Sequence, residues 1–191
     1  MTDITSDSVA GRRMSRSSAA QSAANGATQP QSEDGPQTDL AACVELLFFA
    51  YRDFTGGPDA VLEEYGFGRA HHRVLHFVHR NPGLRVADLL DILKITKQSL
   101  ARVLKQLIDK GFIMQRAGND DRRERRLFVT AKGGRLADKL STQQIKHIEA
   151  ALAKAGPGAA EFAHRFLFAM ITESDRPRVE ALVKLASGKR A

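Results

Sequence analysis

The sequence predicts a mainly α-helical fold with one small β-hairpin, and three observations support this. Apolar residues recur with helical spacing in several segments between residues 39 and 187. Two short stretches of β-prone residues are separated by a turn that contains Gly118, Asn119 and Asp120. Residues 1–38 consist mostly of Ser, Ala, Gly, Gln and Pro. They hold too little apolar surface to offset the entropy lost on ordering, so we expect a disordered tail there.

Three helices are expected in the first half of the folded part. The first covers about 39–54, because apolar side chains repeat there every three or four residues, and a Gly-Gly-Pro sequence at 56–58 is expected to stop it. The second covers about 68–80 and ends at Asn81-Pro82-Gly83. The third is short and covers about 86–93.

A fourth helix, at about 97–110, has the clearest signals. Thr96 is a good N-cap and Gly111 lies where a C′ glycine belongs. Its apolar stripe consists of Leu100, Val103, Leu104, Leu107 and Ile108. Strands at about 112–116 and 127–130 then form a hairpin with a charged tip.

The C-terminal part is expected to be helical again. One long helix covers about 134–154, and a second region at about 159–187 is interrupted near Arg176-Pro177. The second region has more apolar side chains than a small domain needs: Phe162, Phe166, Leu167, Met170, Val179, Leu182, Val183 and Leu185. These side chains need a partner surface, either on a second copy of the chain or within the same chain.

The positive charge of the chain is concentrated in one segment. The net charge is +7, residues 94–135 alone carry +8, and the rest of residues 39–191 is neutral. A local excess of this size makes a polyanion a plausible partner.

Two short helices with a tight turn, followed by a basic hairpin, indicate a winged helix-turn-helix at about 68–131. The buried stripe of the fourth helix leaves an opposite face that can read the major groove of double-stranded DNA, because Gln and Arg form bidentate bonds with purine edges. The predicted contacts on that face are Lys97, Gln98, Ser99, Arg102 and Lys105. At the hairpin tip, Arg122, Arg123 and Arg125 are expected to hold the minor groove or the backbone, while Asp121 pairs with an arginine. The alternative is an ordinary solvated charged face.

Residues 75–130 resemble the MarR family of transcription regulators. The resemblance rests on Asp121-x-Arg123-x-x-x-Leu127-x-Val129-Thr130, followed by Lys132-Gly133. Residues 65–77 are similar to the PetP-type subgroup, although His71-His72 departs from the common family pattern. The resemblance implies a homodimer held by helices at about 39–54 and 134–187. Such a dimer would bind a palindrome whose half-sites are about one helical turn apart.

Together these features predict a sequence-specific transcriptional regulator that binds double-stranded DNA as a homodimer and responds to a small-molecule effector. The alternative is a protein-interaction module that docks a partner regulator and binds DNA weakly. No nucleophile or phosphate-loop motif is present, so we expect no enzyme activity and no cofactor.

Two weaker signals suggest a sensing role. His72, His76 and His79 share one helical face and could bind a metal ion, or they could be two surface histidines and one packed histidine. Cys43 could sense oxidants, but it lies on an apolar stripe, where we expect it to be buried and inert.

Several classes of protein are excluded. One cysteine cannot form a disulfide framework. No apolar run reaches about 18 residues and no secretory signal is evident, so we expect a cytoplasmic protein with no membrane partner.

Overall fold

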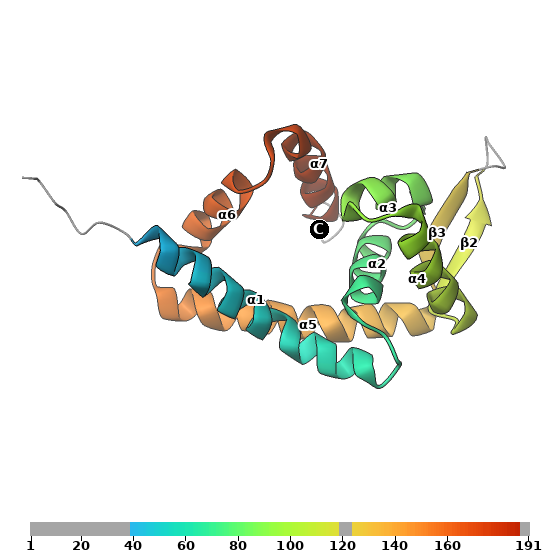
Figure 1. Ribbon diagram of the computed structural model, residues 1–191, viewed down its shortest axis with the longest axis horizontal. Helices are drawn as coiled ribbons and strands as arrows, with labels where there is room; N and C mark the ends of the chain where they lie inside the picture. Colours follow the sequence, from blue (N-terminus) through green and yellow to red (C-terminus); the bar gives the residue numbers. More distant parts are fainter. Residues whose placement is uncertain (1–38, 119–123, 188–191) are drawn as a thin grey trace, which may run out of the picture. The chain divides into compact units, whose positions relative to one another are not determined.

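The computed structural model describes residues 39–118 and 124–187, which are mostly helical with one small antiparallel sheet (Figure 1). This confirms the predicted fold class. In chain order the elements are α1 (Leu40–Glu63), α2 (Arg69–Arg80), β1 (Leu84–Arg85), α3 (Val86–Leu93), α4 (Lys97–Asp109), β2 (Ile113–Ala117), β3 (Arg125–Val129), α5 (Ala131–Ala155), α6 (Ala159–Ala169), the 3-10 turn η1 (Glu173–Asp175) and α7 (Arg176–Ser187).

One hydrophobic core lies between α2, α3, α4, the sheet and parts of α1 and α5. Val74, Leu75 and Val78 of α2 are fully buried in it. The predicted stripe of α4 faces the same core, and each fully buried Leu there contributes about 1.5–3 kcal/mol. Burial of this stripe fixes the rotation of α4, so its polar face is turned to solvent.

Both ends of α4 are capped as the sequence predicts. Thr96 Oγ1 accepts a hydrogen bond from the backbone N–H of Ser99 at 3.1 Å. Gly111 adopts a φ of 73°, which an L side chain rarely takes, and the N–H of Phe112 then donates to the carbonyl of Leu107 at 2.8 Å. The boundaries of α4 are therefore set by local chemistry.

The sheet has the order β1-β3-β2, and all its pairs are antiparallel. The hairpin of β2 and β3 was predicted, with its strands one to two residues away from their observed positions. Strand β1 was not predicted, because two residues carry no periodicity. It forms where Leu84 pairs with the fully buried Leu127.

The predicted end of the first helix was wrong, since α1 continues through Pro58 to Glu63. Proline removes one helical N–H, which normally ends a helix. Here the continuation buries Thr55, Pro58, Val61 and Leu62, and α1 packs along α5. Thr55 Oγ1 also donates to the carbonyl of Tyr51 at 2.9 Å. Burial of these side chains offsets the free energy lost with the missing N–H of Pro58.

Two boundaries near the C-terminus also differ from the prediction. Helix α5 begins at Ala131 and includes Gly133, where an added Cβ would lie 2.0 Å from the carbonyl oxygen of Phe112. Only glycine allows the start of α5 to approach that backbone so closely. The predicted interruption of the last helical region is present between Ala169 and Arg176, but Arg176-Pro177 begins α7 and does not end a helix, because proline is tolerated in a first turn.

Candidate nucleic-acid interface

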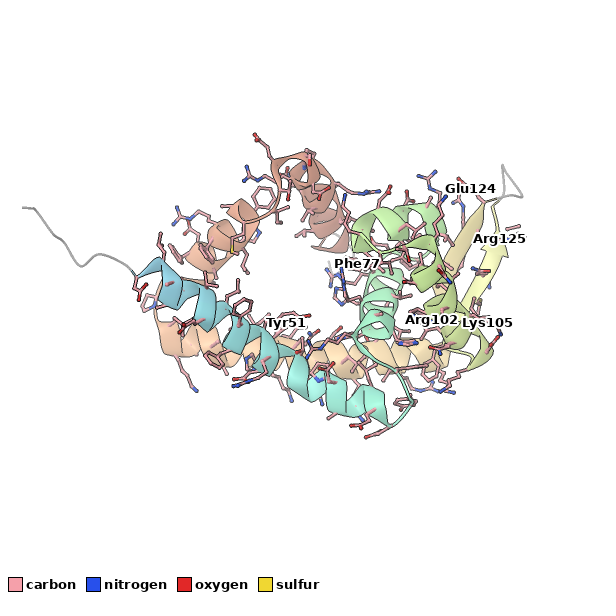
Figure 2. All side chains as sticks on the ribbon, in the orientation of Figure 1. Tyr51, Phe77, Arg102, Lys105, Glu124 and Arg125 are labelled. Carbon is pink, nitrogen blue, oxygen red and sulfur yellow. The ribbon has the colours of Figure 1, made fainter. Side chains whose placement is uncertain are left out.

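The exposed face of α4 has the composition expected of a recognition helix. Lys97, Gln98, Arg102 and Lys105 are all exposed, and Ser99 is half-buried. Figure 2 shows Arg102 and Lys105 on this helix. The structure therefore places the five predicted residues on one accessible helix.

Two of these residues already have partners within the helix. Thr96 Oγ1 donates to Ser99 Oγ at 2.9 Å, so the Ser99 hydroxyl also serves the N-cap. Lys105 Nζ forms an ion pair with Asp109 one turn later. Arg102 has no hydrogen bond or ion pair to another residue of the described chain, so its guanidinium can bond to a ligand at no cost in lost contacts.

A groove lies between α3, α4 and the hairpin of β2 and β3, which we call the wing. Lys97, Lys105 and Asp109 line it from α4, and Arg125 lines it from β3. Figure 2 labels Lys105 and Arg125. Its apolar lining comes from Val86, Ala87, Leu90, Leu100, Ala101, Leu104 and Ile108. The structure thus brings the wing strand and the recognition helix together around one surface.

The base of the wing is held by a network that sequence analysis missed. Glu124 Oε1 accepts from Arg85 Nη1 at 3.3 Å, and Glu124 Oε2 accepts from Arg126 Nη2 at 3.2 Å. Arg85 is also bidentate to Asp88 in the first turn of α3, at 2.7 and 2.8 Å. This chain of ion pairs links the start of α3 to the wing. Its one local signal was the Arg85–Asp88 spacing of three residues.

The network shifts the ionisation of its members. Hydrogen bonds from Arg85 lower the pKa of Asp88, and the bonds to Asp88 and Glu124 raise the pKa of Arg85. Both shifts favour the charged forms. Arg122, Arg123 and the predicted role of Asp121 lie outside the described residues.

The three histidines proposed as metal ligands have separate environments on α2. His72 is 8% exposed, and burial lowers its pKa. His76 is half-buried, and its pKa falls to about 4 through burial and then the nearby charge of Arg80. His79 Nε2 pairs with Asp138 Oδ1 at 2.9 Å. Among the described residues, no three His, Cys, Asp or Glu side chains are grouped so that they could hold a metal ion.

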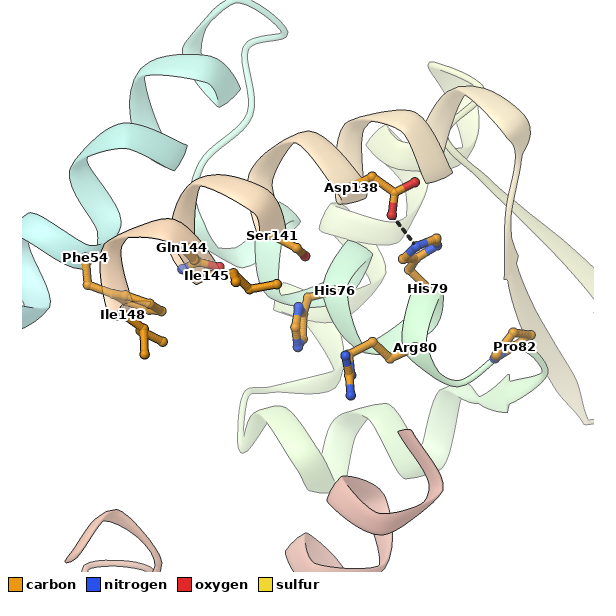
Figure 3. Close-up of a pocket in the computed structure, with 10 residues that line it drawn as sticks. All are labelled: Phe54, His76, His79, Arg80, Pro82, Asp138, Ser141, Gln144, Ile145 and Ile148. Carbon is orange, nitrogen blue, oxygen red and sulfur yellow. Dashed lines mark hydrogen bonds and ion pairs between the residues drawn. The ribbon is translucent and has the colours of Figure 1, made fainter. Parts of the chain in front are cut away.

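His76 and His79 line a cavity of about 440 Å³ between α1, α2 and α5 (Figure 3). Phe54, Ile145 and Ile148 form an apolar wall at one end. Arg80 lines the other end, and no carboxylate in the described chain forms an ion pair with it. The cavity therefore combines an apolar wall with the cation of Arg80, and Asp138, the carboxylate in its lining, pairs with His79.

Exposed apolar side chains gather on the N-terminal half of α1 and on α6. On α1, Leu40 is 74% exposed and Phe48 is 70% exposed, while Phe162 on α6 is 63% exposed. The prediction that Cys43 is buried was wrong for the single chain, because the described residues leave most side chains in this half of α1 exposed. We refer to the exposed apolar side chains of α1, of α6 and of its C-cap Met170 as the apolar surface; they are Leu40, Val44, Leu47, Phe48, Phe162, Phe166 and Met170.

No helix in the described part of the chain is long and apolar enough to cross a membrane.

Comparisons with known proteins agree with this geometry. A family model described as MarR family matches residues 65–124. The HTH-type transcriptional regulator PetP of Rhodobacter capsulatus is 45% identical over 139 residues, which are 73% of this chain and 84% of that protein. The crystal structure of MarR superposes with a TM-score of 0.57 at 21% identity, covering 78% of this chain and 99% of that one. The S. aureus MepR–DNA complex gives 0.55 at 18% identity, with 66% and 94% covered.

Proposed function

Because the chain belongs to the MarR family of transcriptional regulators, we propose that it binds a specific palindromic DNA operator as a homodimer. The observation that carries this proposal is the cationic, exposed face of α4 beside the wing strand, around one groove. The MepR neighbour, which has the same fold, was crystallised with DNA. We infer that the chain acts by binding and not by catalysis.

The residues of this face divide into two roles. Gln98 and Arg102 can each make two hydrogen bonds to a purine edge, so they read bases. Lys97 and Ser99 serve the phosphate backbone at the start of α4, where helix N–H groups also favour anions, and Lys105 serves it from the second half of the helix. The wing residues Arg122, Arg123 and Arg125 hold the minor groove or its phosphates.

Fluorescence anisotropy tests the DNA proposal. DNA from upstream of the gene itself is compared with a random duplex over a salt series, and we expect a preference of about 10³ or more. Arg102→Ala should lower the preference, whereas Arg123→Ala should weaken both duplexes about equally. Lys154→Ala, at the far end of α5, removes one positive charge as a matched control. Equal, weak binding of both duplexes would contradict specific recognition and favour the interaction-module alternative.

The apolar surface supports the homodimer. Large side chains such as Phe48 are rarely left exposed in a contiguous group, and each contributes about 1.5–3 kcal/mol once buried. A second copy related by a two-fold axis offers the same surface in return. Phe48→Glu should therefore shift the sedimentation coefficient from dimer to monomer, while Glu45→Lys, an exposed change on the same helix, should not. A wild-type protein that sediments as a monomer at micromolar concentration would contradict the proposal.

The cavity in Figure 3 supports a response to a small-molecule effector. Its apolar wall and Arg80 fit an anion with an apolar body. Calorimetric titration with aromatic and aliphatic carboxylates, each paired with its neutral amide, tests this. We expect binding of a carboxylate but not of its amide, and loss of that binding in Arg80→Gln. Equal affinity for acid and amide would contradict a role for Arg80.

A further inference from the structure

Two ion pairs join the C-terminal helix to the winged domain of the same chain. Arg178 Nη2 of α7 lies 3.0 Å from Asp91 Oδ2 of α3. Lys94 Nζ, at the end of α3, lies 3.1 Å from Asp175 Oδ1 of η1. Figure 1 shows α7 beside α3. We call these four residues the α3–α7 latch.

The order of charges in the latch specifies one register. The latch consists of two segments, 91–94 and 175–178. In each segment the acid and the base are three residues apart: Asp91 and Lys94 in the first, Asp175 and Arg178 in the second. The two segments pair in antiparallel order, so each acid meets a base. The opposite order would place Asp91 against Asp175 and Lys94 against Arg178, which are repulsive contacts.

Behind the ion pairs the two elements are not closely packed. A cavity of about 340 Å³ lies between α2, α3 and the segment that contains η1 and α7, and its apolar lining comes from Phe77, Ile92, Ile171, Val179, Leu182 and Val183. Interdigitated side chains normally fix how two helices sit against each other. Where a cavity replaces that packing, the charge pairs at its rim carry more of the positioning.

The α3 segment of the latch is directly followed in the chain by the recognition helix α4. Lys94 ends α3 in the left-handed conformation, with a φ of 51°, and Thr96 caps α4 two residues later. Leu93 of α3 and Leu100 of α4 share the core. A shift of α3 against α7 therefore moves the start of α4, where Lys97 and Gln98 lie.

The segment of the latch in η1 and α7 is connected to α6, which carries part of the apolar surface. Arg176 donates from Nε to the carbonyl of Ile171 at 3.0 Å and from Nη2 to the carbonyl of Ala169 at 2.9 Å. These bonds brace the bend between α7 and α6, and α6 carries the exposed Phe162. The bend, the latch and α4 thus form a continuous connection.

We propose that the α3–α7 latch positions the recognition helix relative to the dimer interface, and so sets the half-site spacing that the dimer accepts. This proposal rests on the proposed function, because it requires a dimer that reads two half-sites. Arg178 and Asp175 are positioning residues, since they act through α3 and do not contact DNA. One base pair of extra spacing moves a half-site by about 3.4 Å and rotates it by about 35°, so even a small shift of α4 changes the preferred spacing.

The experiment measures spacing discrimination. Anisotropy gives the affinity for the palindromic operator and for versions with one base pair added to or removed from its centre. The variants are Arg178→Asp, Asp91→Arg and the double exchange Asp91→Arg/Arg178→Asp. Lys184→Glu is the matched control, because Lys184 pairs with Glu180 within α7 and is outside the latch.

The discrimination ratio is the affinity for the operator divided by the affinity for a version with altered spacing. We expect each single variant to lower this ratio about threefold or more, because exposed ion pairs are individually weak but act here in both subunits. The double exchange should restore the discrimination ratio to within about twofold of the wild-type value, and the control variant should have the wild-type ratio. Unchanged discrimination in both single variants, or failure of the exchange to restore it, would overturn the latch. A wild-type protein with no preference for the operator over random DNA would instead overturn the proposed function.

Lys94→Gly keeps the test decisive if a charge reversal unfolds the protein. Glycine adopts a φ of 51° without strain, so this change removes the Lys94–Asp175 pair and leaves the turn intact. Circular dichroism confirms folding of each variant. Folded Lys94→Gly protein should show the same loss of discrimination, and wild-type discrimination in it would refute the proposal.

Discussion

Protonation of His76 should destabilise the fold below neutral pH, and His76→Gln should remove most of that effect. The imidazole lies edge-on to Phe77, with 5.3 Å between ring centroids. Burial, followed by the charge of Arg80, lowers its pKa from 6.5 to about 4. The folded state therefore favours the neutral ring. This contribution to stability is fully present above pH 6.5 and is lost as the pH falls from 6.5 towards 4.

The size of the effect follows from the two pKa values. For a single group with an unfolded pKa of 6.5 and a folded pKa of about 4, the free energy of unfolding falls by about 2 kcal/mol between pH 8 and pH 5. The complete loss, below pH 4, is about 3 kcal/mol. The lowered pKa of the buried His72 acts in the same direction. In His76→Gln, the free energy of unfolding should therefore still fall with falling pH, but less steeply than in the wild type.

Urea unfolding at pH 8 and pH 5 measures this difference. The protein concentration is held constant, because association shifts apparent stability. The matched control is His147→Gln, which changes an exposed histidine of α5 and should keep the wild-type slope. If His76→Gln loses as much stability between the two pH values as the wild type, burial of His76 does not control the pH dependence and the reasoning is refuted.

Three further changes test the packing that supports the site. Gly133→Ala places a Cβ 2.0 Å from a backbone carbonyl oxygen and should lower the free energy of urea unfolding by about 2–3 kcal/mol, while Gly134→Ala, whose Cβ meets nothing closer than 3.7 Å, should leave it equal or slightly higher. Glu124→Gln leaves two cross-strand arginines facing each other and should cost about 0.5–1 kcal/mol in low salt, with a smaller cost in high salt. Thr96→Ala removes the N-cap of α4 and should lower the same free energy by about 1 kcal/mol; no change would show that the cap is not needed.

The elements that sequence analysis predicted well are those with local causes. Helix α4 has its N-cap, its apolar stripe and its C′ glycine within a span of 16 residues, Thr96 to Gly111, and all three appear as predicted. The five predicted recognition residues lie on that helix for the same reason. Their orientation depends only on which side of α4 is buried.

The features that sequence analysis missed depend on residues far apart in the chain. Strand β1 exists only because β3 pairs with it. The turn after Pro58 is helical because it packs on α5. Glu124 reaches Arg85 across 39 positions, and Arg178 reaches Asp91 across 87. No local pattern encodes such distances, so the wing network and the latch become visible only in three dimensions.

The apolar stripes of α1 and α4 show most clearly what periodicity leaves open. Both repeat at the same helical spacing, so both predict a buried face. In the structure the stripe of α4 is covered by the chain's own core, whereas Val44 and Phe48 of α1 stay more than half exposed. The same pattern therefore has two meanings, core or interface, and the difference lies in what the rest of the chain provides. Since the described residues leave most of the N-terminal half of α1 exposed, a second copy is the simplest way to cover it, and the exposed Cys43 would be buried by the same contact.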